Sequence, residues 1–352
     1  MVAGLSTLLP LVVSLVVPQA SSPGTPDAPA PAGVEDPLFT AHEMITLEVV
    51  GPIRAMKEDR GDEPEYHDMT LRWETTGETG ETQVRFRPRG NFRKQRSTCR
   101  DMPPLRLNFA TDEVEGTVFE GQNRLKLVTH CRDGDQYEQN VFEEYLAYRL
   151  YNAVTDESFR VRLVMVTYLD PEEGESATHP GFLIEDEERM AERLGGTIEV
   201  LEQIHPLRYA RGRETRVSVF QYMIGNTDFS QVESHNVVIV RTGEGELLPI
   251  PYDFDWSGLV SARYARPNET LGIRNVRQRL YRGVCHQGLA AESALAPFRA
   301  LPARTAELYA EMEGWEEDSR KQADEYLREF FELLEDPGKA EREIVDRCRR
   351  VG

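Results

Sequence analysis

Hydrophobic and polar residues alternate through the first part of the chain in a pattern that predicts β-strands. Apolar side chains occupy every second position in four short segments: 45–49, 84–86, 105–109 and 125–127. Such alternation places one face of each strand in a core and the other against solvent. Two more strands are expected at 161–168 and 181–185, with a polar loop over 170–180 between them.

A helical pattern replaces this alternation once in the first part of the chain and often in the second. Asn140 is a good helix cap and precedes a run rich in apolar residues, so a helix is expected over 141–154. Further helices are expected at 187–194, 217–224, 294–313 and 316–334. Two aliphatic runs, 237–240 and 247–250, are separated by a Thr-Gly-Glu-Gly turn, which predicts a β-hairpin.

The N-terminal residues have the pattern of an export signal. Residues 1–20 contain a short apolar core and end in small residues, which is typical of a cleaved signal peptide. The Pro/Ala-rich stretch 21–36 predicts a linker. No later stretch is apolar for long enough to cross a membrane. We therefore expect a secreted, periplasmic or cell-surface protein whose folded part divides into a β-rich lobe, 37–180, and a helical lobe, 181–352.

Charge and cysteine content narrow the class of protein further. The net charge of −20 argues against nucleic-acid binding, which needs a basic surface. The four cysteines permit two disulfides in an oxidising compartment, and their spacing does not resemble a zinc site. Cys99 and Cys131 both lie near strand ends of the predicted β-rich part. We expect them to pair, which leaves Cys285 to pair with Cys348.

Lys126 is unusual because the chain contains 36 Arg but only five Lys. It lies in the middle of a predicted inner strand, where a compact ammonium could act as a point charge for phosphate oxygens. A strand residue that faces solvent is the alternative interpretation. Glu143 and Glu144 follow on the next helix, and either carboxylate could pair with this lysine. The apolar pattern of that helix does not choose between them.

Polar side chains flank the predicted hairpin on both sides. Asp228 lies in a loop before the hairpin, and Asn236 comes directly before its first strand. Asp253 and Asp255 follow its second strand, so the hairpin would return Asp253 to the side of Asn236. Carboxylate and amide oxygens suit Mg²⁺, and a loop carboxylate could orient and deprotonate a hydroxyl. The alternative is an ordinary polar turn, where these residue types are common.

Six segments in this order resemble the CotH (spore-coat) kinase family: Arg89-Gly-Asn91, Leu125-Lys-Leu127, Gly181-Phe-Leu-Ile-Glu185, Ile224-Gly-Asn-Thr-Asp228, His235-Asn236 and Tyr252-Asp-Phe-Asp255. The family is a divergent branch of the protein-kinase-like fold, and the resemblance covers about half of the chain. The Gly-Asn-Thr-Asp segment is also similar to the catalytic loops of HipA-type and secretory-pathway kinases. The chain departs from ordinary kinases because it has no Gly-x-Gly-x-x-Gly loop.

The resemblance implies an α+β, bilobal protein-kinase-like fold, with a β-rich N-lobe that contains one major helix and a mostly helical C-lobe. The N-lobe, 37–180, would bind the nucleotide, and the C-lobe, 181–352, would be catalytic. The implied activity is an exported kinase that uses ATP with Mg²⁺ or Mn²⁺ to phosphorylate Ser or Thr of an extracytoplasmic protein. A catalytically inactive pseudokinase scaffold, or a nucleotidyl or glutamyl transferase on the same fold, are the alternatives.

The resemblance also assigns roles to single residues. Asp228 would be the catalytic residue. The metal would be held by Asn236, Asp253 and Asp255. The nucleotide would be contacted by Lys126, Glu144, Arg89, Asn91 and Glu185.

Four arginines follow the predicted metal site in this acidic chain: Arg274, Arg277, Arg279 and Arg282. They could form a docking site for an acidic or phosphorylated partner, or they could form internal ion pairs.

Overall fold

The structure is a computed structural model that describes Met1 and residues 36–286 and 291–350. The predicted signal peptide, apart from Met1, and nearly all of the predicted linker lie outside the described residues. None of the helices within these ranges has the length and hydrophobicity that crossing a membrane requires.

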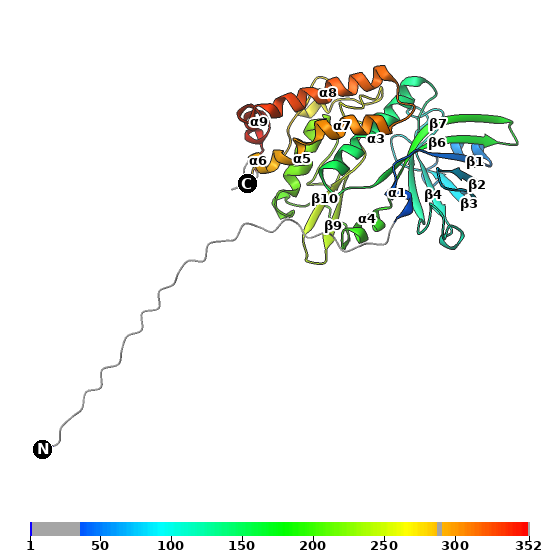
Figure 1. The fold of residues 1–352 in the computed structure, drawn as a ribbon, viewed down its shortest axis with the longest axis horizontal. Coiled ribbons are helices and arrows are strands. Elements are labelled where there is room, and N and C mark those ends of the chain that lie inside the picture. The colour runs from blue at the N-terminus through cyan, green and yellow to red at the C-terminus, as the bar shows by residue number, and fades with distance from the viewer. Residues whose placement is uncertain (2–35, 287–290, 351–352) are drawn as a thin grey trace.

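Seven strands close into a barrel at one end of the molecule (Figure 1). In chain order they are β1 (Ile45–Val50), β2 (His67–Glu74), β3 (Thr79–Pro88), β4 (Leu105–Phe109), β5 (Arg124–Val128), β6 (Val161–Asp170) and β7 (Glu175–Ile184). Their order around the barrel is β1-β2-β3-β4-β5-β7-β6. Neighbouring strands are antiparallel, except that β1 pairs with β6 in parallel and so closes the barrel.

The barrel interior is filled by the apolar residues that alternate along these strands. Leu71, Phe86 and Leu107 are fully buried in this core. Burying one such side chain contributes roughly 1.5–3 kcal/mol. Trp73 lies opposite Gly80 in the β2–β3 register, and a Cβ at Gly80 would approach the indole to 2.1 Å. The alternation therefore specifies the buried face, and a glycine makes room for the largest side chain.

Two short helices, α1 (Pro37–Thr40) and α2 (Ile53–Glu58), pack against the barrel core, and the other helices and a second sheet make up the rest of the described structure (Figure 1). Helix α1 precedes β1, and α2 lies between β1 and β2. The long helix α3 (Asp135–Val154) lies between β5 and β6. After the barrel come α4 (Glu187–Arg193), α5 (Arg213–Ile224), α6 (Ala291–Leu295), α7 (Leu301–Glu311), α8 (Glu317–Glu335) and α9 (Pro337–Glu343). The second sheet has the antiparallel order β10-β9-β8, from β8 (Gly196–Glu199), β9 (Val237–Thr242) and β10 (Leu247–Pro251). Short 3₁₀ turns lie at Thr111–Glu113, Pro206–Arg208, Glu269–Leu271, Ala296–Phe298 and Val345–Arg347.

The predicted bilobal protein-kinase-like fold, with a β-rich N-lobe and a mostly helical C-lobe, is wrong. The first strands form a closed barrel, and the second half of the chain contains a sheet of its own. The helix α3 packs in one core with α5, α7, α8 and the β9–β10 hairpin, whereas the barrel interior forms a separate core. Alternation predicts half-buried strands, but it does not reveal that β1 pairs with β6 and closes the sheet.

Most individual elements agree with the sequence pattern, and three differ. The strands near 45, 84, 105, 125 and 161 are present, as are the hairpin and the helices beginning near 187 and 316. The helix predicted over 141–154 begins earlier, at Asp135, because Asn140 lies inside it and does not cap it. The helix predicted over 294–313 is interrupted, since α6 ends at Leu295 and α7 begins at Leu301 after a 3₁₀ turn. The predicted loop 170–180 is mostly strand, since β6 and β7 pair as a long hairpin with a turn only at 171–174.

Both predicted disulfides are confirmed. Cys99 is bonded to Cys131 and Cys285 to Cys348, and the described part of the chain has no free cysteine. The first bond joins two segments beside the barrel. The second anchors the C-terminal segment, where Val284 also forms an isolated parallel bridge with Arg349.

Candidate functional site

The end of α5 and the segment after β10 lie directly against each other. Gly225 ends α5 in the left-handed conformation with φ of 66°, and a Cβ there would lie 1.9 Å from the Tyr326 hydroxyl. Its carbonyl accepts a hydrogen bond from the amide of Gly258 at 3.1 Å, and that of Ile224 accepts one from Leu259 at 3.0 Å. These backbone bonds hold the Asp228 loop beside the segment that contains Asp253 and Asp255.

Asp228 lies at the centre of a small polar network in this loop. The Asn236 side chain donates to the carboxylate of Asp228 at 3.1 Å and to its carbonyl at 2.8 Å. His235 Nε2 lies 3.1 Å from the other carboxylate oxygen, and Asn226 Oδ1 accepts the Asp228 amide at 2.8 Å. The Asp228 side chain is 37% exposed, so it is fixed in position and still accessible.

The hairpin returns Asp253 to the side of Asn236, as its sequence predicted. Val237 pairs with Pro251 in the register, and the Tyr252 amide donates to the Asn236 carbonyl at 3.1 Å. Asp253 has a positive φ of 62°, which is uncommon for a non-glycine residue. Its amide donates to the Tyr148 hydroxyl of α3 at 2.9 Å, and this contact holds the strained turn against the helix.

Two buried carboxylates share one arginine next to this turn. Arg93 Nη1 lies 3.3 Å from Glu144 Oε2 and 3.7 Å from Asp255 Oδ2. Asp255 also accepts the Tyr264 hydroxyl at 2.9 Å. Burial raises the pKa of Glu144 and of Asp255 above the ordinary range, and the charge of Asp253 adds to both shifts. The charge of Arg93 opposes both shifts, and the charge of Arg89 also opposes the shift of Glu144.

Asn236, Asp253 and Asp255 carry the oxygen donors of the expected metal site, but among the described residues neither aspartate belongs to a group of three His, Cys, Asp or Glu side chains whose ligand atoms all lie within 4.8 Å. A divalent ion bound beside them would oppose the mutual repulsion of Asp253 and Asp255. Asn236 donates through its nitrogen to Asp228, so its carbonyl oxygen is the atom that could act as a ligand. Carboxylate and amide oxygens are the donors that Mg²⁺ and Mn²⁺ prefer.

Lys126 points toward the hairpin and pairs with neither of the helix glutamates, Glu143 and Glu144. It lies on β5, is 8% exposed, and forms an ion pair with Glu187 at the start of α4. Its ammonium lies 5.0 Å from the ring centroid of Tyr252, the neighbour of Asp253. Burial lowers the pKa of Lys126, with a further contribution from the charge of Arg89. Glu144, which the family resemblance would place beside this lysine, pairs with Arg93.

The other three residues predicted to contact the nucleotide, Arg89, Asn91 and Glu185, have different surroundings. Arg89 belongs with the cluster: burial lowers its pKa and the charge of Asp253 opposes that shift. Asn91 is exposed in the turn after β3. Glu185 is buried, and its carboxylate is held by Arg193 at 2.7 and 2.8 Å. The Glu185 carboxylate is therefore engaged in an ion pair with Arg193.

The sequence assigned no role to four residues that complete the cluster, Arg93, Tyr148, Glu187 and His235, although His235 belongs to the His235-Asn236 motif. Arg93 lies two positions beyond Asn91, and His235 precedes Asn236, so proximity to the motifs was an available signal for both. Tyr148 and Glu187 are distant in sequence from their partners Asp253 and Lys126, and no local pattern marks them.

The arginines that follow the site are mostly engaged inside the molecule. Arg282 donates to the carbonyls of Thr227 and Phe229 at 2.7 and 2.6 Å, so it braces the Asp228 loop. Arg279 pairs with Glu329 at 2.7 Å, and Arg277 lies over the ring of Tyr326. Three of the four arginines, Arg277, Arg279 and Arg282, therefore form internal contacts, which favours this interpretation over a docking site for a partner.

A cavity of about 770 Å³ lies beside the start of α3, and none of the predicted site residues lines it. Its lining includes Glu143, which is buried and accepts hydrogen bonds from Asn140 at 2.8 Å and Ser319 at 2.9 Å. Burial raises the pKa of Glu143 to about 7, although both hydrogen bonds and the charge of Arg277 act in the opposite direction.

The raised pKa of Glu143 predicts a pH-dependent stability. Between its ordinary value of 4.5 and about 7, the folded protein retains a proton that the unfolded chain releases. The free energy of unfolding should therefore fall as pH rises through this window, by no more than about 3 kcal/mol. Urea unfolding at pH 5 and pH 8 should show a smaller loss in Glu143→Gln than in wild type, because the raised pKa values of Glu144 and Asp255 contribute to the loss in both proteins. The exposed neighbour Glu316→Gln serves as the control, and an identical pH trend in wild type and Glu143→Gln would contradict the prediction.

Comparison with known proteins gives no family assignment. No protein-family model matches the chain, and no curated protein matches its sequence. Among solved structures, the chain is similar to the HipA–HipB toxin–antitoxin complex with operator DNA from Shewanella oneidensis MR-1, at 11% sequence identity and a TM-score of 0.34. The alignment covers 91% of this chain and 76% of that chain. This likeness to a kinase-like toxin is distant and carries no argument about function, and the resemblance to CotH kinases stays one of motifs.

Proposed function

We propose that the protein is an exported phosphotransferase that uses ATP and Mg²⁺ or Mn²⁺ to phosphorylate a Ser or Thr hydroxyl of an extracytoplasmic protein. One observation supports this proposal above others. Asp228, Asn236, Asp253 and Asp255 lie in two adjoining segments, and the buried cation Lys126 lies beside the same hairpin. Both disulfides support export, because such bonds persist in oxidising compartments.

In this proposal the metal ligands and the cations have separate tasks. Asp253, Asp255 and Asn236 would hold the ion, which when bound neutralises charge on the phosphates. Lys126 and Arg89 would neutralise further phosphate charge from the barrel side. Glu187 would keep the Lys126 ammonium in place, since the two form an ion pair. Catalysis of this kind depends mainly on positioning and electrostatic stabilisation.

Asp228 would orient the acceptor hydroxyl and accept its proton. The hydroxyl oxygen would bond to the γ-phosphorus as the bond to the ADP oxygen breaks, and the proton would pass to the Asp228 carboxylate. Asn236 and His235 fix that carboxylate through hydrogen bonds at 3.1 Å each. The partly exposed position of Asp228 suits a residue that must meet a protein substrate.

Calorimetric titration with ATP and Mg²⁺ or Mn²⁺ tests the proposal. Wild type should bind the metal–nucleotide complex, and Asp253→Ala should weaken binding at least tenfold because it removes a principal carboxylate ligand. Lys126→Ala should also weaken binding, and Lys126→Arg should restore it only in part, because a guanidinium fork does not replace a point charge.

Asp112→Ala is the matched control, since this carboxylate is exposed on a barrel turn outside the cluster. Absence of nucleotide binding by wild type under every metal condition would reject the phosphotransferase. Binding without transfer would favour the scaffold alternative. The mass added to a modified protein would distinguish phosphoryl transfer from nucleotidyl or glutamyl transfer.

A further inference from the structure

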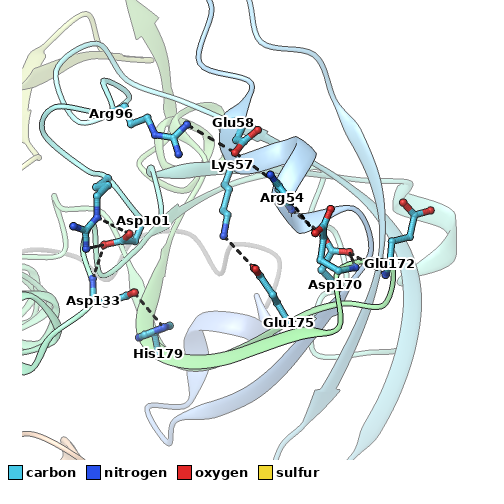
Figure 2. A network of polar contacts seen from close by, with 12 residues as sticks. Arg54, Lys57, Glu58, Arg96, Asp101, Asp133, Asp170, Glu172, Glu175 and His179 are labelled. Carbon is cyan, nitrogen blue, oxygen red and sulfur yellow. Dashed lines mark hydrogen bonds and ion pairs between the residues drawn. The ribbon is translucent and has the colours of Figure 1, made fainter.

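Two histidines and an aspartate converge beside the barrel, outside the cluster described above. His130 follows β5, Asp133 precedes α3, and His179 lies on β7. Their ligand atoms all lie within 4.8 Å of one another. Asp133 Oδ1 is 3.4 Å from His130 Nε2 and 3.8 Å from His179 Nε2. Figure 2 shows Asp133 directed at His179 across this gap.

These separations approach those expected for ligands on a single ion. A tetrahedral zinc-type ion with bonds of about 2.0–2.1 Å holds its ligand atoms roughly 3.3 Å apart. The two measured distances to Asp133 need to shorten by only a few tenths of an ångström. The two rings are stacked, with centroids 3.6 Å apart and planes at 17°, so ion binding would also tilt them until both lone pairs converge.

The surrounding structure fixes each of the three residues. The Cys99–Cys131 bond anchors the residue next to His130, and Asp101 accepts the Asp133 amide at 3.0 Å. His179 Nδ1 lies 2.7 Å from Glu138 Oε1. A carboxylate on the outer nitrogen of a histidine is the usual partner of a metal-binding imidazole, because it orients the ring and selects the tautomer with Nε2 free.

Burial and access both suit an ion. The His130 and His179 side chains are 2% and 13% exposed, whereas Asp133 is 63% exposed and lines the cavity of about 770 Å³. One buried and one half-buried imidazole therefore meet one accessible carboxylate, and the cavity offers a path of entry. Imidazole nitrogen favours zinc-type transition ions over Mg²⁺ or Ca²⁺.

We propose that His130, Asp133 and His179 bind one divalent transition-metal ion of the zinc type, with Glu138 orienting His179. The ion would join β7 to the segment between β5 and α3. It is distinct from the ion assigned to Asp253 and does not depend on the proposed phosphotransferase activity.

Titration of untagged full-length protein with Co²⁺ and Zn²⁺ tests this proposal. Co²⁺ should produce visible absorption that saturates at one ion per chain and is lost when Zn²⁺ is added. Asp133→Ala and His179→Ala should each weaken Zn²⁺ binding at least tenfold, and Glu138→Gln should weaken it by roughly tenfold, the lower end for loss of an outer partner. Zn²⁺ should raise the melting temperature of wild type and not of Asp133→Ala.

Two controls make the outcome decisive. His67→Ala removes a histidine that also pairs with an aspartate, Asp59 at 3.2 Å, but has no part in this cluster. Asp135→Ala removes an exposed carboxylate two positions from Asp133. Both should bind Zn²⁺ as wild type does. Failure of wild type to bind either ion would overturn the proposal. Equal binding by wild type and Asp133→Ala would also overturn it, because the ions would then bind elsewhere, for example near Asp253.

Discussion

Asp228→Asn is expected to reduce phosphoryl transfer by roughly a hundredfold or more, the usual scale for loss of a positioned base. Nucleotide and metal binding should remain nearly unchanged, because the amide keeps the shape of the side chain and Asp228 is not a proposed metal ligand. The carboxylate accepts hydrogen bonds from Asn236 and faces His235, so its position is set before a substrate arrives. Single-turnover transfer assays beside calorimetric binding measure the two effects separately.

Glu233→Gln is the matched control for this substitution. It removes an exposed carboxylate from the same loop, and its transfer rate should equal that of wild type. Transfer by Asp228→Asn at the wild-type rate would exclude Asp228 as the base. Loss of binding together with transfer would instead indicate that Asp228 supports the architecture of the loop.

Arg93→Met is expected to lower the free energy of unfolding by about 3–5 kcal/mol at pH 8, the scale for leaving a buried charge without its partner. Arg93 contacts Glu144 and Asp255, whose side chains are 3% and 6% exposed. Without the charge of Arg93, the pKa values of Glu144 and Asp255 in the folded variant would rise further. The deficit should therefore shrink toward pH 5, where protonation removes the uncompensated charge. Chemical denaturation of wild type and Arg93→Met at pH 8 and pH 5 measures the loss of unfolding free energy and shows whether it shrinks at the lower pH.

Two further variants separate charge compensation from simple loss of packing. Arg93→Met with Glu144→Gln should recover part of the stability, because one buried charge is removed along with its partner. Arg96→Met provides the control: this arginine is 65% exposed and lies 3.8 Å from Glu58, so its loss should change stability by less than about 1 kcal/mol. A pH-independent deficit in Arg93→Met would attribute the effect to packing alone.

The sequence predicted local elements better than their assembly. The alternation in β3 and β4 is visible because one face of each strand fills the barrel. The outer half of β7 has exposed residues on both faces, so it carries no alternation and was predicted as a loop. The parallel contact between β1 and β6 joins segments more than a hundred residues apart, and no local pattern encodes it.

The candidate site shows the same limit. Asn236 and Asp253 could be predicted as neighbours because they flank the two strands of one hairpin, and a hairpin brings its two ends together. Glu143 and Glu144 could not be distinguished, since α3 is buried on nearly all sides and both glutamates are buried. Their roles follow from long-range partners, Ser319 for Glu143 and Arg93 for Glu144. The pair His130 and His179 is likewise joined only when β5 pairs with β7.

The pairing of β1 with β6 also determines how this protein can meet other chains. Closure pairs every barrel strand with a neighbour on both sides along part of its length, so within the described barrel an unpaired edge remains only where one strand extends past its neighbour, as in residues 175–181 of β7, which pair with β6 and not with β5. Among the described residues, the three-stranded sheet does keep outer strands, β8 and β10, and β10 is buried along its whole length. Any substitution that separates β1 from β6 would create two long, apolar edges at once, and the expected consequence is aggregation and not merely a looser barrel.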